Sequence, residues 1–130
     1  MNDWNQVIDS NPIRPAAVLT NAYVDCVVIR NAEHNNQLIL YVDVTIGSLT
    51  TAEFKVQFSL TGEDNTWFDE VVETVSSGVA TALPQVHRTA ATGKKAYMIP
   101  VKHKYIKVSC IGNGTVTSSS MAVWAALGNV

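Results

Sequence analysis

The fold is decided by the stretch from Gln37 to Ile46, which has the sequence QLILYVDVTI. Every second residue in it is apolar, namely Leu38, Leu40, Val42, Val44 and Ile46. The alternate positions are mostly polar: Gln37, Tyr41, Asp43 and Thr45. Successive side chains of a β-strand point to opposite faces of the sheet, so this pattern predicts a strand with one buried face and one exposed face.

The same period of two recurs on the C-terminal side of this stretch. It predicts three further strands, at residues 52–60, 105–111 and 119–127, whose inward residues are Ala52, Phe54, Val56, Phe58 and Leu60; Ile106, Val108 and Cys110; and Met121, Val123, Ala125 and Leu127. Less regular patterns predict strands at residues 22–29, 66–75 and 96–101. Residues 79–88 are expected to be an irregular, mobile stretch. No window longer than one turn has the period of a helix.

A chain of 130 residues, 47% hydrophobic and 15% charged, fits one globular domain. About eight short strands separated by turns predict an all-β fold, a single antiparallel β-sandwich of jelly-roll or immunoglobulin-like type, over residues 16–130. Residues 1–15 are expected to form an extended N-terminal arm. They are polar and end in the sequence NPIRP, in which two prolines resist regular structure.

The charged residues are divided unevenly along the chain. The formal net charge is only −2. Residues 1–73 hold all 11 acidic residues and three basic ones, a net charge of −8, whereas residues 74–130 hold six basic residues and no acidic one, a net charge of +6. The total excludes a nucleic-acid binder that depends on bulk positive charge. The division favours contacts between copies in which opposite charges meet.

Cys26 and Cys110 are too few for a disulfide framework, and both lie in apolar, strand-like runs. We expect two buried thiols, or a disulfide if the two strands are neighbours. The first residues lack the basic and apolar regions of a signal peptide. No apolar stretch approaches the roughly 20 residues that span a bilayer. The expected site of synthesis is therefore a cytoplasm, without secretion by a signal peptide and without membrane contact.

The sequence does not predict an enzyme. A nucleophilic serine needs a base and an orienting acid, but there is no G-x-S-x-G motif, and no acidic residue follows Glu73. His87 and His103 have basic neighbours in the sequence, which disfavours metal binding. No glycine-rich loop opens a helix, as phosphate binding would require. We expect no catalytic residue, no metal and no cofactor.

Two groups of residues are candidates for contacts with partners. The first lies in or beside the arm and consists of Trp4, Val7, Ile8, Ile13 and Arg14. The second is a basic patch that consists of Lys94, Lys95, Lys102 and Lys104, with Tyr97 and Tyr105 nearby in the sequence. An aromatic residue in a polar arm has no local core to enter, so we expect Trp4 to dock elsewhere on its own domain or on another subunit. The lysines either discourage aggregation at a sheet edge or contact a protein.

Two parts of the chain together resemble a known family. The first part contains LILYVDVTIGSLT (38–50), FKVQFSLTG (54–62) and TWF (66–68), and the second contains YIKVSC (105–110), GNGTVT (112–117) and the strand at 119–126. They are similar to small β-sandwich virion proteins of tailed bacteriophages, of the head-decoration (auxiliary capsid, or cement) kind. A pattern S-x-(D/T)-G followed by T-W also occurs in sugar-binding jelly rolls, with Thr61 here in place of their usual aspartate.

The resemblance implies a non-enzymatic structural protein of the virion. It would bind the outer surface of the head, contact the major capsid protein and stabilise the lattice as a homo-oligomer, with a trimer favoured. The arm would reach a neighbouring coat subunit, because 15 residues extend up to about 50 Å. The resemblance brings no catalytic residue.

Two alternative functions stay open. One is an adhesion protein that resembles a carbohydrate-binding module, with Trp67, Trp124 or Tyr97 as the stacking platform for a glycan and a calcium site near Glu63 and Asp64. The other is a tail or neck assembly component, which differs from a decoration protein mainly in ring symmetry.

Overall fold

The fold is all-β and antiparallel. A computed structural model describes residues 3–7, 12–30, 32–101 and 103–129. These residues form one short 3₁₀ helix, η1 (Ala32–His34), and twelve strands: β1 (Asp3–Val7), β2 (Arg14–Ala17), β3 (Val24–Asp25), β4 (Gln37–Thr45), β5 (Leu49–Ser59), β6 (Phe68–Asp69), β7 (Val71–Ser76), β8 (Val79–Pro84), β9 (His87–Thr89), β10 (Gly93–Pro100), β11 (Tyr105–Gly114) and β12 (Ser120–Asn129). Within this part of the chain, no helix has the length and apolar character needed to cross a membrane.

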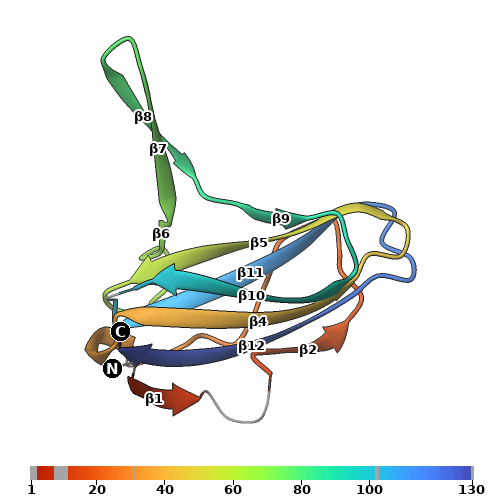
Figure 1. Cartoon of the computed structure of the whole chain (residues 1–130), viewed down its shortest axis with the longest axis horizontal. Helices are drawn as coiled ribbons and strands as arrows, with labels where there is room; N and C mark the ends of the chain where they lie inside the picture. Colours follow the sequence, from red (N-terminus) through yellow and green to blue (C-terminus); the bar gives the residue numbers. More distant parts are fainter. Residues whose placement is uncertain (1–2, 8–11, 31, 102, 130) are drawn as a thin grey trace.

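The strands form three sheets (Figure 1). The first has five strands in the order β1-β12-β4-β10, with β2 also paired to β12. The second has five strands in the order β3-β11-β5-β6, with β9 also paired to β5. The third is the hairpin of β7 and β8, which stands away from the other two. The two large sheets share one core, and the hairpin contributes no residue to it.

The core contains most of the inward residues predicted from the alternation. The prediction is wrong for Leu60, which is 77% exposed because β5 ends at Ser59 and Leu60 lies in the turn that follows. Leu38, Leu40, Val42 and Val44 of β4 are buried, and so are Phe54 and Val56 of β5, Ile106, Val108 and Cys110 of β11, and Met121, Val123, Ala125 and Leu127 of β12. Burying one such aliphatic or aromatic side chain stabilises the fold by about 1.5–3 kcal/mol. The predicted inward face of β4 is therefore confirmed. β4 is an interior strand of the first sheet, because it pairs with both β12 and β10.

The predicted number of about eight strands is not confirmed, partly because some predicted strands are divided. The segment predicted at residues 22–29 pairs as a strand only at Val24–Asp25. The chain leaves β11 at Val27, whose N–H donates to the carbonyl of Ile13 (3.0 Å), and returns at Ile29, which bridges to Ile106.

The expectation of an irregular stretch at residues 79–88 is wrong, since these residues contain β8 and β9. The strand predicted at 66–75 is also divided, at Glu70, into β6 and β7. The N–H of Glu70 donates to the carbonyl of Val56 (3.0 Å), and its own carbonyl accepts from the N–H of Gln85 (2.8 Å). The chain therefore leaves the second sheet at Glu70 and returns to it after Gln85.

The predicted boundary between an arm (1–15) and a domain (16–130) falls inside strand β2. Both β1 and β2 pair with β12, so the described part of the arm runs along the first sheet. Arg14 is only 8% exposed. Its Nε donates to the carbonyl of Met121 (3.0 Å), and its Nη2 donates to the carbonyls of Ala17 and Val18 (3.3 and 3.2 Å). These bonds compensate for the burial of the guanidinium group.

Cys26 and Cys110 are free thiols, and both are buried. Their Sγ atoms lie 3.9 Å apart, because β3 and β11 are neighbours. The hydrogen bond with Cys110 and burial raise the pKa of the Cys26 thiol, so this thiol stays protonated and unreactive at neutral pH.

We predict that a thiol reagent such as Ellman's reagent modifies neither cysteine in the folded protein and both in denaturant. Burial removes each sulfur from the reagent, and only the thiolate reacts. The measurement is the absorbance of the released thiolate over time. Modification within seconds under native conditions would contradict the buried placement.

We also predict that Leu40→Ala lowers the free energy of unfolding by about 2–5 kcal/mol, because it leaves a cavity in a closely packed core. Leu60→Ala is the matched control, since Leu40 is 0% exposed and Leu60 is 77% exposed. The control should change the free energy by less than about 0.5 kcal/mol. Equal losses in urea unfolding would show that the core is placed wrongly.

Candidate functional site

The outer face of the first sheet carries a row of three residues from three strands. Trp124 of β12 lies opposite Tyr41 of β4, and Tyr41 lies opposite Ala96 of β10. Because neighbours such as Leu40, Val42 and Val123 point into the core, these residues point outward. Tyr41 is 46% exposed, and Trp124 is half-buried. The sheet therefore presents two aromatic rings beside a small residue.

The next outward row, two residues farther along each strand, is polar at two of its three positions. Ala122 of β12 lies opposite Asp43 of β4, which lies opposite Lys94 of β10. Rows on one face of a sheet are separated by about 7 Å, two residues of strand. The backbone positions of Asp43 and Lys94 therefore lie about 7 Å from the aromatic row, a distance similar to the width of a sugar ring.

These two rows border an open groove of about 290 Å³. Its lining residues are Tyr41, Val42, Asp43, Lys94, Lys95, Ala96 and Trp124. We call it the sheet groove. It combines apolar ring surface, a hydrogen-bond acceptor and a hydrogen-bond donor, which are the groups that a small polar ligand with an apolar face needs.

A second groove, of about 460 Å³, lies at the base of the β7–β8 hairpin. It is lined by Phe58, Ser59, Leu60, Phe68, Asp69, Glu70, Val71 and His103. The ring of His103 stacks on Phe58 at a centroid distance of 4.2 Å. Asp69 accepts a hydrogen bond from Gln57 (2.8 Å), and Glu70 is 3.0 Å from His87. Its acidic groups are therefore already paired within the chain.

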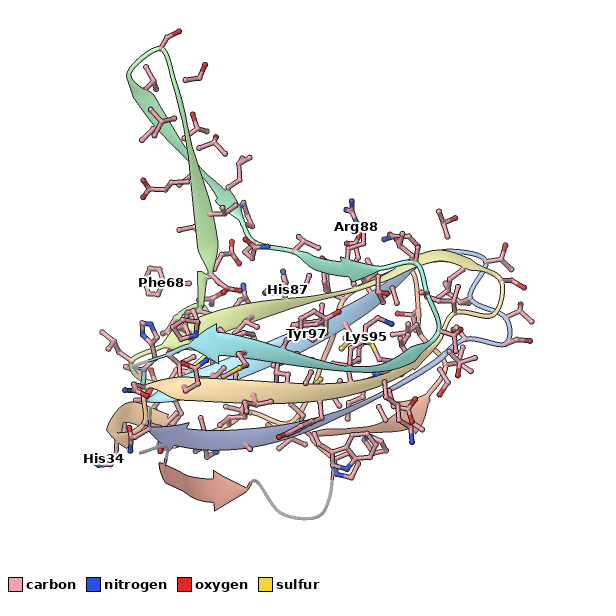
Figure 2. All side chains as sticks on the ribbon, viewed as in Figure 1. His34, Phe68, His87, Arg88, Lys95 and Tyr97 are labelled. Atoms are coloured by element: carbon pink, nitrogen blue, oxygen red, sulfur yellow. The ribbon has the colours of Figure 1, made fainter. Side chains whose placement is uncertain are left out.

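Two polar contacts hold β9 in place. His87 Nε2 lies 3.0 Å from Glu70 Oε1, and Arg88 Nε donates to Glu53 Oε1 (2.6 Å). The His87 ring stacks on Phe54 with a centroid distance of 4.7 Å. Figure 2 shows His87 and Arg88 on β9, above the ring of Tyr97. The contact between His87 and Glu70 closes the base of the hairpin.

Tyr97 belongs to the inside of the fold. Its ring contacts Phe54 edge to face at a centroid distance of 4.8 Å and also meets His87 at 5.7 Å. Burial raises the pKa of Tyr97 above its usual value of 10.0. Of the three aromatic residues proposed as a glycan platform, Tyr97 is thus the one engaged in the core. Trp67 lies under Lys107, whose Nζ is 4.5 Å from its ring centroid. Trp124 borders the sheet groove.

The structure separates the predicted basic patch. Lys94 and Lys95 follow Gly93 at the start of β10, opposite Asp43 and Val42 near the end of β4. Lys104 lies at the other end of β4, where its carbonyl accepts from the N–H of Ala32 just before that strand. Lys102 lies outside the described residues. Only Lys94 and Lys95 therefore share a site, the sheet groove, and Lys95 also donates to the carbonyl of Ala91 (2.9 Å).

The candidate residues of the arm are placed as follows. Val7 pairs through its backbone with Ala126 of β12, and Trp4 lies in the same strand, β1. Ile8 lies outside the described residues. Ile13 is buried in the core, and Arg14 is buried through the three backbone bonds given above. Ile13 and Arg14 thus make their contacts within this copy.

The turn that contains Glu63 and Asp64 is exposed, and in the described ranges no three His, Cys, Asp or Glu side chains are grouped to hold a metal ion. Tyr41 and Asp43 were not predicted as binding residues from the sequence. Their position on the outward face of β4 was visible in the alternation, but their approach to Trp124 and Lys94 depends on the pairing of β4 with β12 and β10.

We predict that alkaline pH destabilises the protein partly through Tyr97. Because the pKa of Tyr97 is raised in the folded state, its contribution to stability is complete below about pH 10 and is lost as pH rises through the folded value. Tyr97→Phe should therefore show a smaller loss of unfolding free energy between neutral pH and about pH 11. Urea unfolding at several pH values measures this, and identical slopes for both proteins would contradict it.

No protein-family model and no curated protein matches the chain. Among solved structures, it is similar to the K3 cleaved adhesin domain of Lys-gingipain from Porphyromonas gingivalis w83, with a TM-score of 0.51 and 14% identity over 88% of this chain and 72% of that chain. Two structures of Clostridium perfringens ZmpB with CBM51-2 and INT domains are also similar, at 15% and 16% identity. The first, with GlcNAc, has a TM-score of 0.44, and the second has 0.41.

Both ZmpB matches cover 99% of this chain and 28% of the ZmpB chain. All three named structures are bacterial, and none of them bears on the resemblance to head-decoration proteins. At 14% identity, the likeness to the Lys-gingipain domain concerns the fold alone: the chain has an antiparallel all-β fold similar to that of a bacterial adhesin domain.

Proposed function

We propose that this chain is a non-enzymatic carbohydrate-binding module of an adhesion protein, which holds a sugar unit of a glycan in the sheet groove. The observation that carries the proposal is the row of Trp124, Tyr41 and Ala96 on the outer face of the first sheet, with Asp43 and Lys94 in the next row. This is the glycan-binding alternative of the sequence analysis, with Tyr41 added to Trp124 as the platform.

The chemistry of the groove suits a pyranose ring. One face of such a ring is lined by C–H groups, which pack on an aromatic side chain, while its hydroxyl groups need hydrogen-bond partners. Tyr41 and Trp124 offer the aromatic surface. The carboxylate of Asp43 accepts, and the ammonium group of Lys94 donates, so a pair of neighbouring hydroxyls finds both kinds of partner.

The size of the groove limits the ligand. Ligand pockets typically measure about 300–1,000 Å³, and the sheet groove, at about 290 Å³, is at the small end of this range. It therefore suits one sugar unit of a larger glycan, and its open shape lets the rest of the glycan continue along the sheet. The supporting fold, which we propose to be a β-sandwich of jelly-roll or immunoglobulin-like type, is similar to that of an adhesin domain.

We predict that an array of neutral and sialylated oligosaccharides identifies a ligand and that Trp124→Ala and Tyr41→Ala each weaken its binding at least about tenfold, a loss of 1.4 kcal/mol or more. Each variant loses the ring surface on which the sugar packs. Titration calorimetry with the oligosaccharide that gives the strongest array signal measures the change, and thermal unfolding confirms that each variant is folded.

Phe68→Ala is the matched control, because Phe68 is an exposed aromatic residue at the base of the hairpin and not in the sheet groove. It should bind the oligosaccharide like the unmodified chain. The proposal fails if the array detects no glycan, if both groove variants keep their affinity, or if the control loses binding as they do.

A capsid decoration protein is the second candidate. The observation that favours it is the exposed hairpin of β7 and β8, which projects from the body as a contact arm would. The neighbourhood of the gene tests it. A position beside genes for a major capsid protein and its protease would favour decoration, and a position beside genes for surface or glycan-degrading proteins would favour adhesion.

A further inference from the structure

No part of the described chain covers the β7–β8 hairpin. All residues from Val71 to Pro84 are exposed, and among the described strands these two pair only with each other. Figure 1 shows the hairpin standing away from both large sheets. A two-stranded ribbon that packs against nothing is marginally stable in water at best. The formation of this hairpin therefore requires a local or an intermolecular source of stability.

The local sequence favours this shape. Ser77 and Gly78 join the strands with φ values of 51° and 78°, and two successive positive φ angles are typical of the tight turn whose twist fits a hairpin. A side chain added at Gly78 would meet no atom within 4 Å, so the conformation, and not the space, favours glycine here. The contacts of Glu70 with His87 and of Glu70 with Gln85 close the other end.

The hairpin also exposes much apolar surface. Thirteen large hydrophobic residues are exposed in the described chain, and five of them are Val71, Val72, Val75, Val79 and Leu83. A concentrated exposed apolar surface of this kind marks a site of interaction with a partner.

The register divides the hairpin into two different faces. One face consists of the pairs Val71–Pro84, Glu73–Ala82 and Val75–Ala80, and the other consists of Val72–Leu83, Thr74–Thr81 and Ser76–Val79. The first face carries a charge, Glu73. The second carries none, and its apolar residues lie at both ends with two threonines in the middle. We call it the uncharged face.

We propose that the uncharged face of this hairpin packs against the same face of a second copy, with the two hairpins antiparallel around a two-fold axis. The pattern of the face is self-complementary in this arrangement. Val79, at the tip of one hairpin, lies over Val72 and Leu83 at the base of the other. The threonines meet at the axis, where cross-strand and facing Thr side chains pack and form hydrogen bonds.

Glu73 explains why the dimer is expected to form through the uncharged face and not through the first face. Packing through the first face would bring the Glu73 carboxylates of the two copies together near the axis, and like charges in close apposition oppose association. In the proposed pair, both Glu73 side chains point to solvent. A reciprocal contact of this kind closes after two copies, so it produces a dimer and not the trimer that the resemblance implies.

The expected strength follows from the area. Two six-residue strands measure about 20 Å in length, and covering one face of two such hairpins buries less than roughly 1,000 Å² in total. This area is below the roughly 1,200–2,000 Å² of stable specific interfaces and is typical of weak, transient contacts. We therefore expect a dimer with a dissociation constant in the micromolar range. The contact uses no residue of the sheet groove, so both grooves of a dimer remain available.

Sedimentation velocity of the full chain between about 1 and 200 µM tests the proposal. The unmodified chain should shift from the mass of one copy, 14.1 kDa, to twice that mass. Thr81→Lys places like charges at the axis and should weaken the dimer more than about tenfold. Ala82→Lys is the matched control, because this neighbouring residue lies on the face of Glu73; it adds the same charge and should keep the dimer.

A charge exchange makes the test sharper. Thr81→Lys mixed with Thr81→Glu should restore the dimer, although each variant alone should be weakened. The midpoint of thermal unfolding of the two large sheets should be equal in all variants, since the hairpin lies outside the core. The proposal is overturned by a chain that stays monomeric at 200 µM, by a trimer, by equal effects of Thr81→Lys and Ala82→Lys, or by a mixture that remains monomeric.

Discussion

The structure depends on the burial of one face of β4 against the second large sheet. Leu38, Leu40, Val42 and Val44 enter the core that both large sheets share, and pairing with β12 and β10 places β4 at the centre of the first sheet. Because side chains alternate between the two faces of a strand, Tyr41 must point outward when Leu40 and Val42 point inward. A slip of one residue in the register would bury Tyr41 and Asp43 and expose the core residues. The register that stabilises the fold therefore also builds the sheet groove.

The sequence predicted this framework where one face is apolar and the other polar. The alternation in residues 37–46 was sufficient because Leu38, Leu40, Val42 and Val44 are buried, whereas Tyr41 and Thr45 on the other face are exposed. The second strand of the hairpin was missed, whereas most of the first lies inside the strand predicted at 66–75. Both faces of the second strand are exposed: Ala80 and Ala82 lie on one face, and Val79, Thr81 and Leu83 lie on the other, so no apolar and polar alternation exists there. The turn at Ser77–Gly78 was the only local sign of it.

The sequence predicted the groove only in part. Trp124 was identified as an outward aromatic residue. The other two residues of its row, Tyr41 and Ala96, lie 83 and 28 positions before it in the chain. Strand order decides such neighbours, and one sequence does not reveal strand order. The same limit applies to the basic patch, in which Lys94 and Lys104 are close in the sequence but lie toward opposite ends of β4.

Arg14 has a consequence for how the chain can be shortened. Its guanidinium group is bonded to the carbonyls of Met121, Ala17 and Val18, and the next residue toward the N-terminus, Ile13, belongs to the core. Removal of residues 1–15 would leave the Met121 carbonyl without this donor and open a cavity beside β12. The smallest independently folding unit thus includes Ile13 and Arg14, and a trimmed chain that is meant to isolate the role of the arm has to retain both.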